Sequence, residues 1–143
     1  MSVAFLMNRQ KPKLAPDLAK RADRLTVTIA TLKAQIQEII DRGEVAPKGC
    51  YVARYQVRQR QKVYWYYKLQ ATDAIFEQAT DSEKKSKYKH LGRAGSEEHI
   101  AAVTQVMRRN QIDELERTIN SLANSLLDLY YDKESETLPE NPD

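Results

Sequence analysis

Basic and tyrosine side chains alternate along the stretch between residues 54 and 68, and their types suggest a shared chemistry. Lys and Arg neutralise phosphates, and Tyr stacks on bases or donates hydrogen bonds to phosphate oxygens. The candidate binding residues are Arg54, Arg58, Lys62, Tyr64, Tyr66, Lys68, Lys87 and Lys89. No paired carboxylates, triad or ligand cluster accompanies them, so we expect a non-catalytic protein that binds nucleic acid.

An alternation with a period of two must position these side chains on a β-hairpin. In the first run, residues 51–58, the odd positions are apolar or aromatic; in the second, residues 62–71, the apolar side chains again fall on odd positions. The two runs join near residues 59–61, a loop length typical of an antiparallel hairpin, although its turn type and register stay open. We therefore expect one outer face that carries Arg54, Arg58, Lys62, Tyr64, Tyr66 and Lys68.

A third strand is expected to follow after an acidic interruption. Residues 72–83 lack a clean period, and we interpret them as a loop with Ile75 and Phe76 tucked inward. Residues 84–91 resume an extended basic pattern and would add Lys87 and Lys89 to the sheet. The predicted sheet spans residues 50–91, and Gly92 and Gly95 bracket the turn that follows.

Two long helices flank this sheet. Residues 16–42 carry a heptad stripe that begins after Pro16 and stops at Gly43. Residues 96–131 carry a second stripe with a phase break at 108–111, and Ser96 is a suitable N-cap. The side chains expected to pair the helices are Leu25, Ile29, Leu32, Ile36, Leu115, Ile119, Leu122 and Leu126. This pairing lies within one chain, across a homodimer or against another protein.

Length and charge complete the predicted organisation. The 143 residues fit one α+β domain over residues 16–131, preceded by a flexible basic arm (1–15) and followed by an acidic disordered tail (132–143). Lys plus Arg against Asp plus Glu count 8 to 4 over residues 1–43, 13 to 7 over 44–110, and 2 to 9 over 111–143. The local net charges of +4, +6 and −7 favour a basic working surface with an acidic end.

Several classes of function are disfavoured by the composition. A single cysteine, Cys50, excludes an intramolecular disulfide and is typical of a reducing compartment, so we expect a cytoplasmic protein. No stretch approaches membrane-spanning length. Four glycines argue against a phosphate-cradling loop, and we expect no cofactor. His90 and His99 have no partners at metal-binding spacing, so we expect no metal site.

The segments YWYYKLQ (64–70) and KYKHLGRAGSEEHIAAV (87–103) are similar to parts of AP2-type domains and of the amino-terminal DNA-binding domain of some integrases. The likeness covers residues 50–106 at most. It implies three antiparallel strands whose face lies in the major groove of DNA, with a helix packed behind them. The hairpin also resembles short, uncharacterised proteins of bacterial mobile elements.

The leading hypothesis is therefore binding of double-stranded DNA through the basic aromatic sheet face, by a chain that forms a homodimer. RNA is the less favoured nucleic acid, since exposed tyrosines also stack on unpaired bases. The alternative hypothesis is a protein-interaction or assembly module that acts through its coiled-coil helices. A third interpretation is that the basic aromatic face is an ordinary solvent-exposed surface without a ligand.

Overall fold

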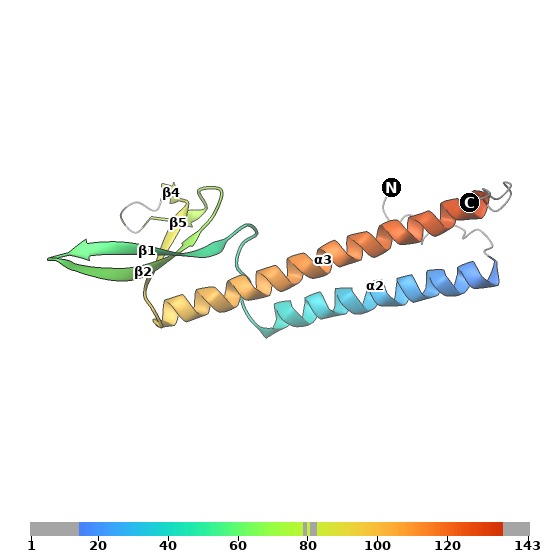
Figure 1. Ribbon diagram of the computed structural model, residues 1–143, viewed down its shortest axis with the longest axis horizontal. Coiled ribbons are helices and arrows are strands. Elements are labelled where there is room, and N and C mark those ends of the chain that lie inside the picture. The colour runs from blue at the N-terminus through green and yellow to red at the C-terminus, as the bar shows by residue number, and fades with distance from the viewer. Residues whose placement is uncertain (1–14, 79, 81–82, 136–143) are drawn as a thin grey trace. The chain divides into compact units, whose positions relative to one another are not determined.

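The computed structural model describes residues 15–78, 80 and 83–135 of the chain. Its elements are helix α2 (Pro16–Arg42), strands β1 (Tyr51–Gln59), β2 (Lys62–Gln70), β3 (Phe76–Glu77), β4 (Lys85–Ser86) and β5 (Tyr88–Arg93), and helix α3 (Glu97–Ser135) (Figure 1). This is the predicted α+β class, with two helices and a three-stranded antiparallel sheet. The predicted arm, except for Ala15, and the predicted tail from residue 136 onward lie outside the described residues. Residues 132–135, which we expected in the disordered tail, belong instead to α3.

The chain divides into two compact units. The first consists of residues 1–38 and 113–143, and the second consists of residues 39–112. The first contains most of α2 and the second half of α3. The second contains all the strands and the first half of α3.

In the first unit the helices pack side by side, as the apolar stripes predict. Leu18 and Ala22, near the start of α2, form a buried cluster with Leu126 and Leu129 near the end of α3. Leu25 and Tyr130 pack against this cluster, and Ile29 is buried on the same stripe. The other predicted pairing residues are only half-buried, namely Leu32, Ile36, Leu115, Ile119 and Leu122.

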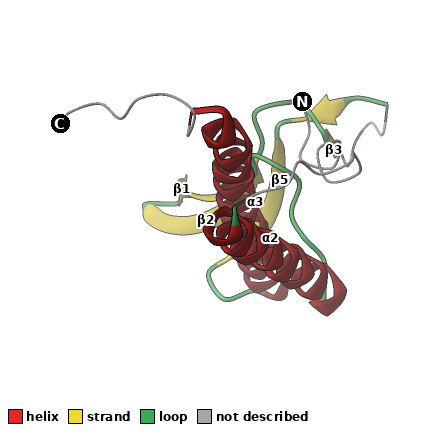
Figure 2. Cartoon of the chain, turned by 90° about the vertical axis from the view of Figure 1, so that its right-hand side faces the viewer, coloured by secondary structure: helices red, strands yellow, loops and turns green. Residues whose placement is uncertain are grey.

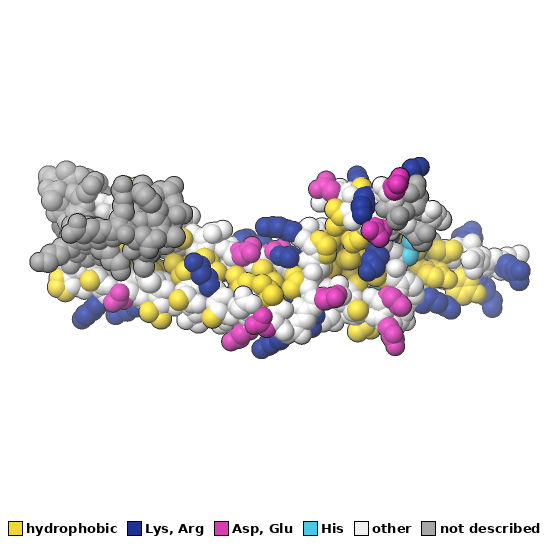
Figure 3. All heavy atoms as spheres, turned by 180° about the vertical axis from the view of Figure 1, so that it is seen from behind, with side chains coloured by type: hydrophobic (Ala, Val, Ile, Leu, Met, Phe, Trp, Pro, Cys, Tyr) yellow, Lys and Arg dark blue, Asp and Glu magenta, His cyan; other side chains and the backbone are white. Residues whose placement is uncertain are grey.

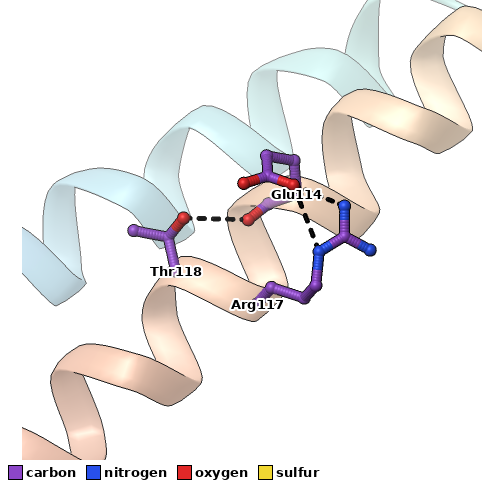
Figure 4. Close-up of polar contacts among 3 residues, drawn as sticks. All are labelled: Glu114, Arg117 and Thr118. Carbon is purple, nitrogen blue, oxygen red and sulfur yellow. Dashed lines mark hydrogen bonds and ion pairs between the residues drawn. The ribbon is translucent and has the colours of Figure 1, made fainter.

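The helix ends and surfaces follow local rules. Helix α2 begins at Pro16, with Asp17 in its first turn paired to Arg21 at 3.3 Å, and ends just before Gly43. On α3, the exposed Arg117 side chain pairs with Glu114, whose backbone carbonyl also accepts from Thr118 Oγ1 at 3.0 Å (Figure 4). The guanidinium of Arg117 donates this hydrogen bond to the Glu114 carboxylate, which raises the pKa of Arg117. The phase break at 108–111 leaves α3 one continuous helix.

In the second unit β1 and β2 form the predicted hairpin, closed by a tight two-residue turn. Tyr51 lies opposite Gln70 at the base, and Gln59 lies opposite Lys62 next to the turn. The two turn residues, Arg60 and Gln61, both have positive φ, at 46° and 67°. Positive φ at both central positions is the mark of a type I′ turn, whose twist matches that of paired strands.

The segment after β2 differs from the prediction. We expected a loop over 72–83 and one strand over 84–91, whereas the strand is divided at Lys87 into β4 and β5. Phe76 and Glu77 pair with Ser86 and Lys85, so β3 and β4 make a small sheet, which lies apart from the main one (Figure 2). Phe76 packs on the core as expected, while Ile75 is exposed.

Strand β5 completes the main sheet, whose order is β1-β2-β5. It pairs with residues 66–70 of β2, and a bulge lies between Tyr67 and Lys68, which face Gly92 and His90. Leu91, the residue between those two partners, is buried. Gly92 has a φ of 87°, a value that L-residues with side chains rarely adopt.

One face of the sheet is covered by the first half of α3. The buried cluster joins Cys50, Leu69 and Leu91 of the sheet region to Ala102 of α3, together with Ala46 and Ala71. Val52, Tyr67, Phe76 and Val106 pack around it. Burial of these side chains fixes which face of the base of the hairpin points inward.

The connector before β1 is tied to α3. Arg108 Nη1 donates to the carbonyl of Glu44 at 3.0 Å, and Arg109 Nε donates to the carbonyl of Ala46 at 2.8 Å. The backbone N–H of Ala46 donates to the carbonyl of Gln105 at 3.1 Å. These bonds hold the start of β1 against the first half of α3, so the sheet and this half of the helix form one folded body.

Candidate nucleic-acid interface

The strand register decides which side chains share a face of the sheet. In an antiparallel pair, directly opposite residues project to the same side. Tyr55 lies opposite Tyr66, and Val57 lies opposite Tyr64. Lys68 lies opposite His90, and Tyr66 lies opposite Arg93. The face away from α3, here named the tyrosine face, therefore carries Tyr55, Lys62, Tyr64, Tyr66, Lys68, Tyr88, His90 and Arg93.

The prediction that Arg54 and Arg58 share this face is wrong. Arg54 lies opposite Tyr67, and Arg58 lies opposite Val63, so both arginines project to the other side of the hairpin. The odd positions of β1 and the even positions of β2 thus share one face. The side chain that decides the orientation is Val52, which packs with Leu69 against the core.

The rings and cations of the tyrosine face contact one another. The rings of Tyr55 and Tyr66 stack with centroids 6.0 Å apart and planes 29° apart. Lys68 Nζ lies 4.3 Å from the ring centroid of Tyr88 and 5.3 Å from that of Tyr55. The guanidinium carbon of Arg93 lies 4.9 Å from the ring centroid of Tyr64. Cation–π contacts of this length hold the charges above the rings, on the outer surface of the sheet.

A hydrogen bond adds to the order of the face. The hydroxyl of Tyr55 lies 3.0 Å from Nδ1 of His90. His90 also meets the ring of Tyr55 edge-on, with centroids 6.1 Å apart. These contacts fix the rotamer of Tyr55, so its ring presents a defined surface for stacking rather than a mobile one.

Lys87 and Lys89 are exposed but do not join the tyrosine face. Lys89 lies opposite Leu69, whose side chain belongs to the core side of the sheet. Lys87 precedes β5, and its carbonyl accepts from the N–H of Ala71 at 2.9 Å. Tyr55, Tyr88, His90 and Arg93 are members of the face that sequence reasoning did not assign to it. On β5, the alternation of Tyr88, His90 and Arg93 with Lys89 and Leu91 is interrupted by a bulge, which hid the signal.

The hairpin has no negative charge. No Asp or Glu occurs from residue 45 to residue 72, a range that holds six Lys or Arg: Lys48, Arg54, Arg58, Arg60, Lys62 and Lys68. In the space-filling view, the hairpin tip at the right-hand end shows hydrophobic and basic side chains (Figure 3). A shallow depression at this tip is lined by Gln59, Arg60, Lys62 and Tyr64. The hairpin is therefore an attractive surface for a polyanion.

Other chemistries find little support in the described part of the chain. No group of three or more His, Cys, Asp or Glu there is placed to hold a metal ion. Cys50 is buried, and burial raises the pKa of its thiol, against a smaller lowering by Arg109. Neither helix has, within its described residues, an apolar stretch long enough to cross a bilayer. Comparison with protein-family models, curated proteins and solved structures finds no match.

Proposed function

We propose that this chain is a non-catalytic cytoplasmic protein that binds nucleic acid, with double-stranded DNA as its ligand, through the tyrosine face. The observation that carries the proposal is the position of Lys68 and Arg93 over the rings of Tyr55, Tyr64 and Tyr88, on a hairpin without acids. The two cations would neutralise phosphates, and the tyrosine hydroxyls would donate to phosphate oxygens.

The shape of the hairpin supports a duplex as the ligand. Among the described residues, strand β5 pairs with residues 66–70 of β2, so residues 56–65 of the hairpin form a ribbon of two strands. A two-stranded ribbon is narrow enough to enter the major groove of B-DNA. Arg60 and Lys62 at its tip would then reach the phosphates that border the groove.

We further propose that the first unit forms a homodimer. The two helices do not fully bury the apolar stripes along which they pair. Five side chains of these stripes are only half-buried: Leu32, Ile36, Leu115, Ile119 and Leu122. A groove in this unit is lined by Leu25 and Leu129 and bordered by Arg21, Arg24, Ser125 and Asp128. Charges of both signs beside apolar side chains suit a symmetric contact with a second copy.

The assembly module is the second candidate function. The observation that favours it is a stripe of exposed apolar side chains on α3, at Ile100, Val103 and Met107, whose spacing places them on one face of the helix. A partner helix could cover this stripe. This function predicts association that does not weaken as salt rises, and no affinity for nucleic acid.

The deciding experiment measures binding of a mixed-sequence duplex to the purified full chain over a series of salt concentrations. We expect the affinity to fall steeply with salt, and Lys68→Ala/Arg93→Ala to weaken binding and reduce the slope of log K against log salt by about 2. The control Lys20→Ala/Lys33→Ala removes two exposed lysines of α2 and should change neither quantity by as much. No duplex binding by the unaltered chain at low salt would reject the proposal.

A further inference from the structure

An exposed Trp–Arg pair lies on the hairpin face opposite the tyrosine face. Trp65 lies opposite Gln56 and Arg54 lies opposite Tyr67, so both project to the same side. The guanidinium carbon of Arg54 is 3.9 Å from the centroid of the indole ring. Trp65, the only Trp of the chain, remains 40% exposed, and Val63 on the same face is 45% exposed.

The core does not account for Trp65. On this side of the sheet, among the described residues, the buried cluster and the side chains packed around it include Val52, Tyr67 and Leu69 but neither Trp65 nor Val63. The part of the face that carries Trp65 therefore keeps a large apolar ring in contact with solvent. An exposed aromatic ring beside a cation is a composition found at binding surfaces.

The chemistry of the pair suits an unpaired nucleobase. Indole rings and guanidinium planes both stack on bases, whereas the bases of an intact duplex are already stacked on one another. Arg58 lies on the same side and can contact the phosphate of such a nucleotide. The hairpin offers no carboxylate that would repel the strand.

We propose that the Arg54–Trp65 pair receives one unpaired base of a DNA whose duplex part is bound at the tyrosine face. The preferred ligand is then a duplex next to unpaired nucleotides, such as one with a single-stranded overhang. Strand β1 is an outer strand of the sheet, so a nucleic-acid strand can pass around its free edge from one face to the other. This inference rests on the proposed function and specifies the ligand of the same hairpin.

The test compares a blunt DNA duplex with the same duplex carrying a short overhang at either end. We expect the overhang to tighten binding by about 5- to 150-fold, the range for one stacked base. Trp65→Ala should remove this gain and leave the affinity for the blunt duplex unchanged. Val63→Ala, which trims a neighbouring exposed side chain of the same face, is the control and should keep the gain.

The fluorescence of the single Trp gives a second readout at the site itself. We expect the overhang duplex, but not the blunt one, to quench the emission of Trp65, since only a base stacked close to the indole would do so. Arg54→Lys keeps the charge but loses the planar group, and should reduce the gain more than Val63→Ala does.

The outcomes separate this inference from the function on which it rests. Binding of the blunt duplex without any gain from the overhang, or an equal gain in Trp65→Ala, overturns the base-stacking site and leaves duplex binding intact. Loss of blunt-duplex affinity in Trp65→Ala also overturns it, because Trp65 would then serve the duplex or the fold. Failure of the unaltered chain to bind either DNA overturns both proposals.

Discussion

The hydroxyl of Tyr55 on β1 lies 3.0 Å from Nδ1 of His90 on β5, although these strands are not neighbours in the sheet. The contact spans β2 on the tyrosine face, where Lys68 lies opposite His90. It links the hairpin to the strand that leads into α3. A side-chain bond of this kind joins the two outer strands across β2, which backbone pairing between adjacent strands does not do.

Tyr55→Phe should weaken the folded state by about 0.5–1.5 kcal/mol, since it removes one hydrogen bond and leaves the ring in place. The quantity to measure is the free energy of unfolding in urea. Tyr66→Phe is the matched control, because it removes a hydroxyl from the other ring of the stacked pair and leaves the bond to His90 untouched. Equal losses in the two variants would contradict a specific role for this bond.

The turn of the hairpin offers a change that should raise stability and lower binding together. Arg60 and Gln61 have positive φ, which costs L-residues with side chains about 1–2 kcal/mol each, whereas Asn-Gly is the preferred pair for this turn. We expect Arg60→Asn/Gln61→Gly to raise the free energy of unfolding by about 1–2 kcal/mol. Because Arg60 is a cation at the tip, the same variant should bind duplex DNA more weakly.

Gln61→Gly alone separates the two effects of that change. It relieves one strained position and keeps Arg60, so it should stabilise the hairpin without loss of affinity. A loss of DNA affinity in the single variant would show that the turn conformation, rather than the charge of Arg60, sets binding.

The helix pair should depend strongly on Leu126, which is only 1% exposed. We expect Leu126→Ala to cost about 2–5 kcal/mol through lost burial and the cavity it leaves. The loss can be followed by circular dichroism during thermal unfolding. Val27→Ala on α2, at a position 65% exposed, is the control and should change the midpoint little. A small effect of Leu126→Ala would argue that the helices do not pack through this cluster.

The Cys50 thiol should respond to pH in a defined direction. Burial raises its pKa above the ordinary value of 9.0, so below that pH both the folded and the unfolded thiol stay protonated. Above it the unfolded thiol ionises first, and the free energy of unfolding should fall. Cys50→Ala should show a smaller fall over the same range.

Alkylation by iodoacetamide gives an independent check on Cys50. At neutral pH the folded chain should react far more slowly than the chain in urea, because the thiolate is the reactive form and the side chain is buried. Comparable rates would place the thiol at the surface.

The sequence predicted the positions of the helices and of the hairpin better than it predicted which side chains share a face of the sheet. Helix α2 has the bounds expected from Pro16 and Gly43, because apolar spacing and end signals act locally. The hairpin was located correctly for the same reason. The face of β1 depended instead on a tertiary contact, since Tyr51 and Tyr55 suit either side of a sheet and only packing of Val52 against the core selects one.

The third strand shows a second limit of local reasoning. The bulge at Tyr67 and Lys68 shifts the register by one residue, so His90 and Arg93 project to the same face although they are three apart in the chain. Simple alternation cannot reveal this. On α3, Ala102 and the half-buried Val106 contact the sheet, whereas Ile100, Val103 and Met107 stay exposed, and helical spacing alone does not reveal which of these positions meets the sheet.

The position of β1 at the rim of the sheet has a consequence for self-association. An edge strand has unpaired backbone N–H and C=O groups that can pair with another strand. Two copies of the chain could therefore form one continuous sheet by pairing their β1 strands. If two copies of β1 paired antiparallel about Gln56, Arg54 of each copy would lie opposite Arg58 of the other. Like charges directly opposite oppose such pairing. Arg54 and Arg58, on the face opposite the tyrosine face, thus disfavour a dimer formed by pairing of two β1 strands in this register.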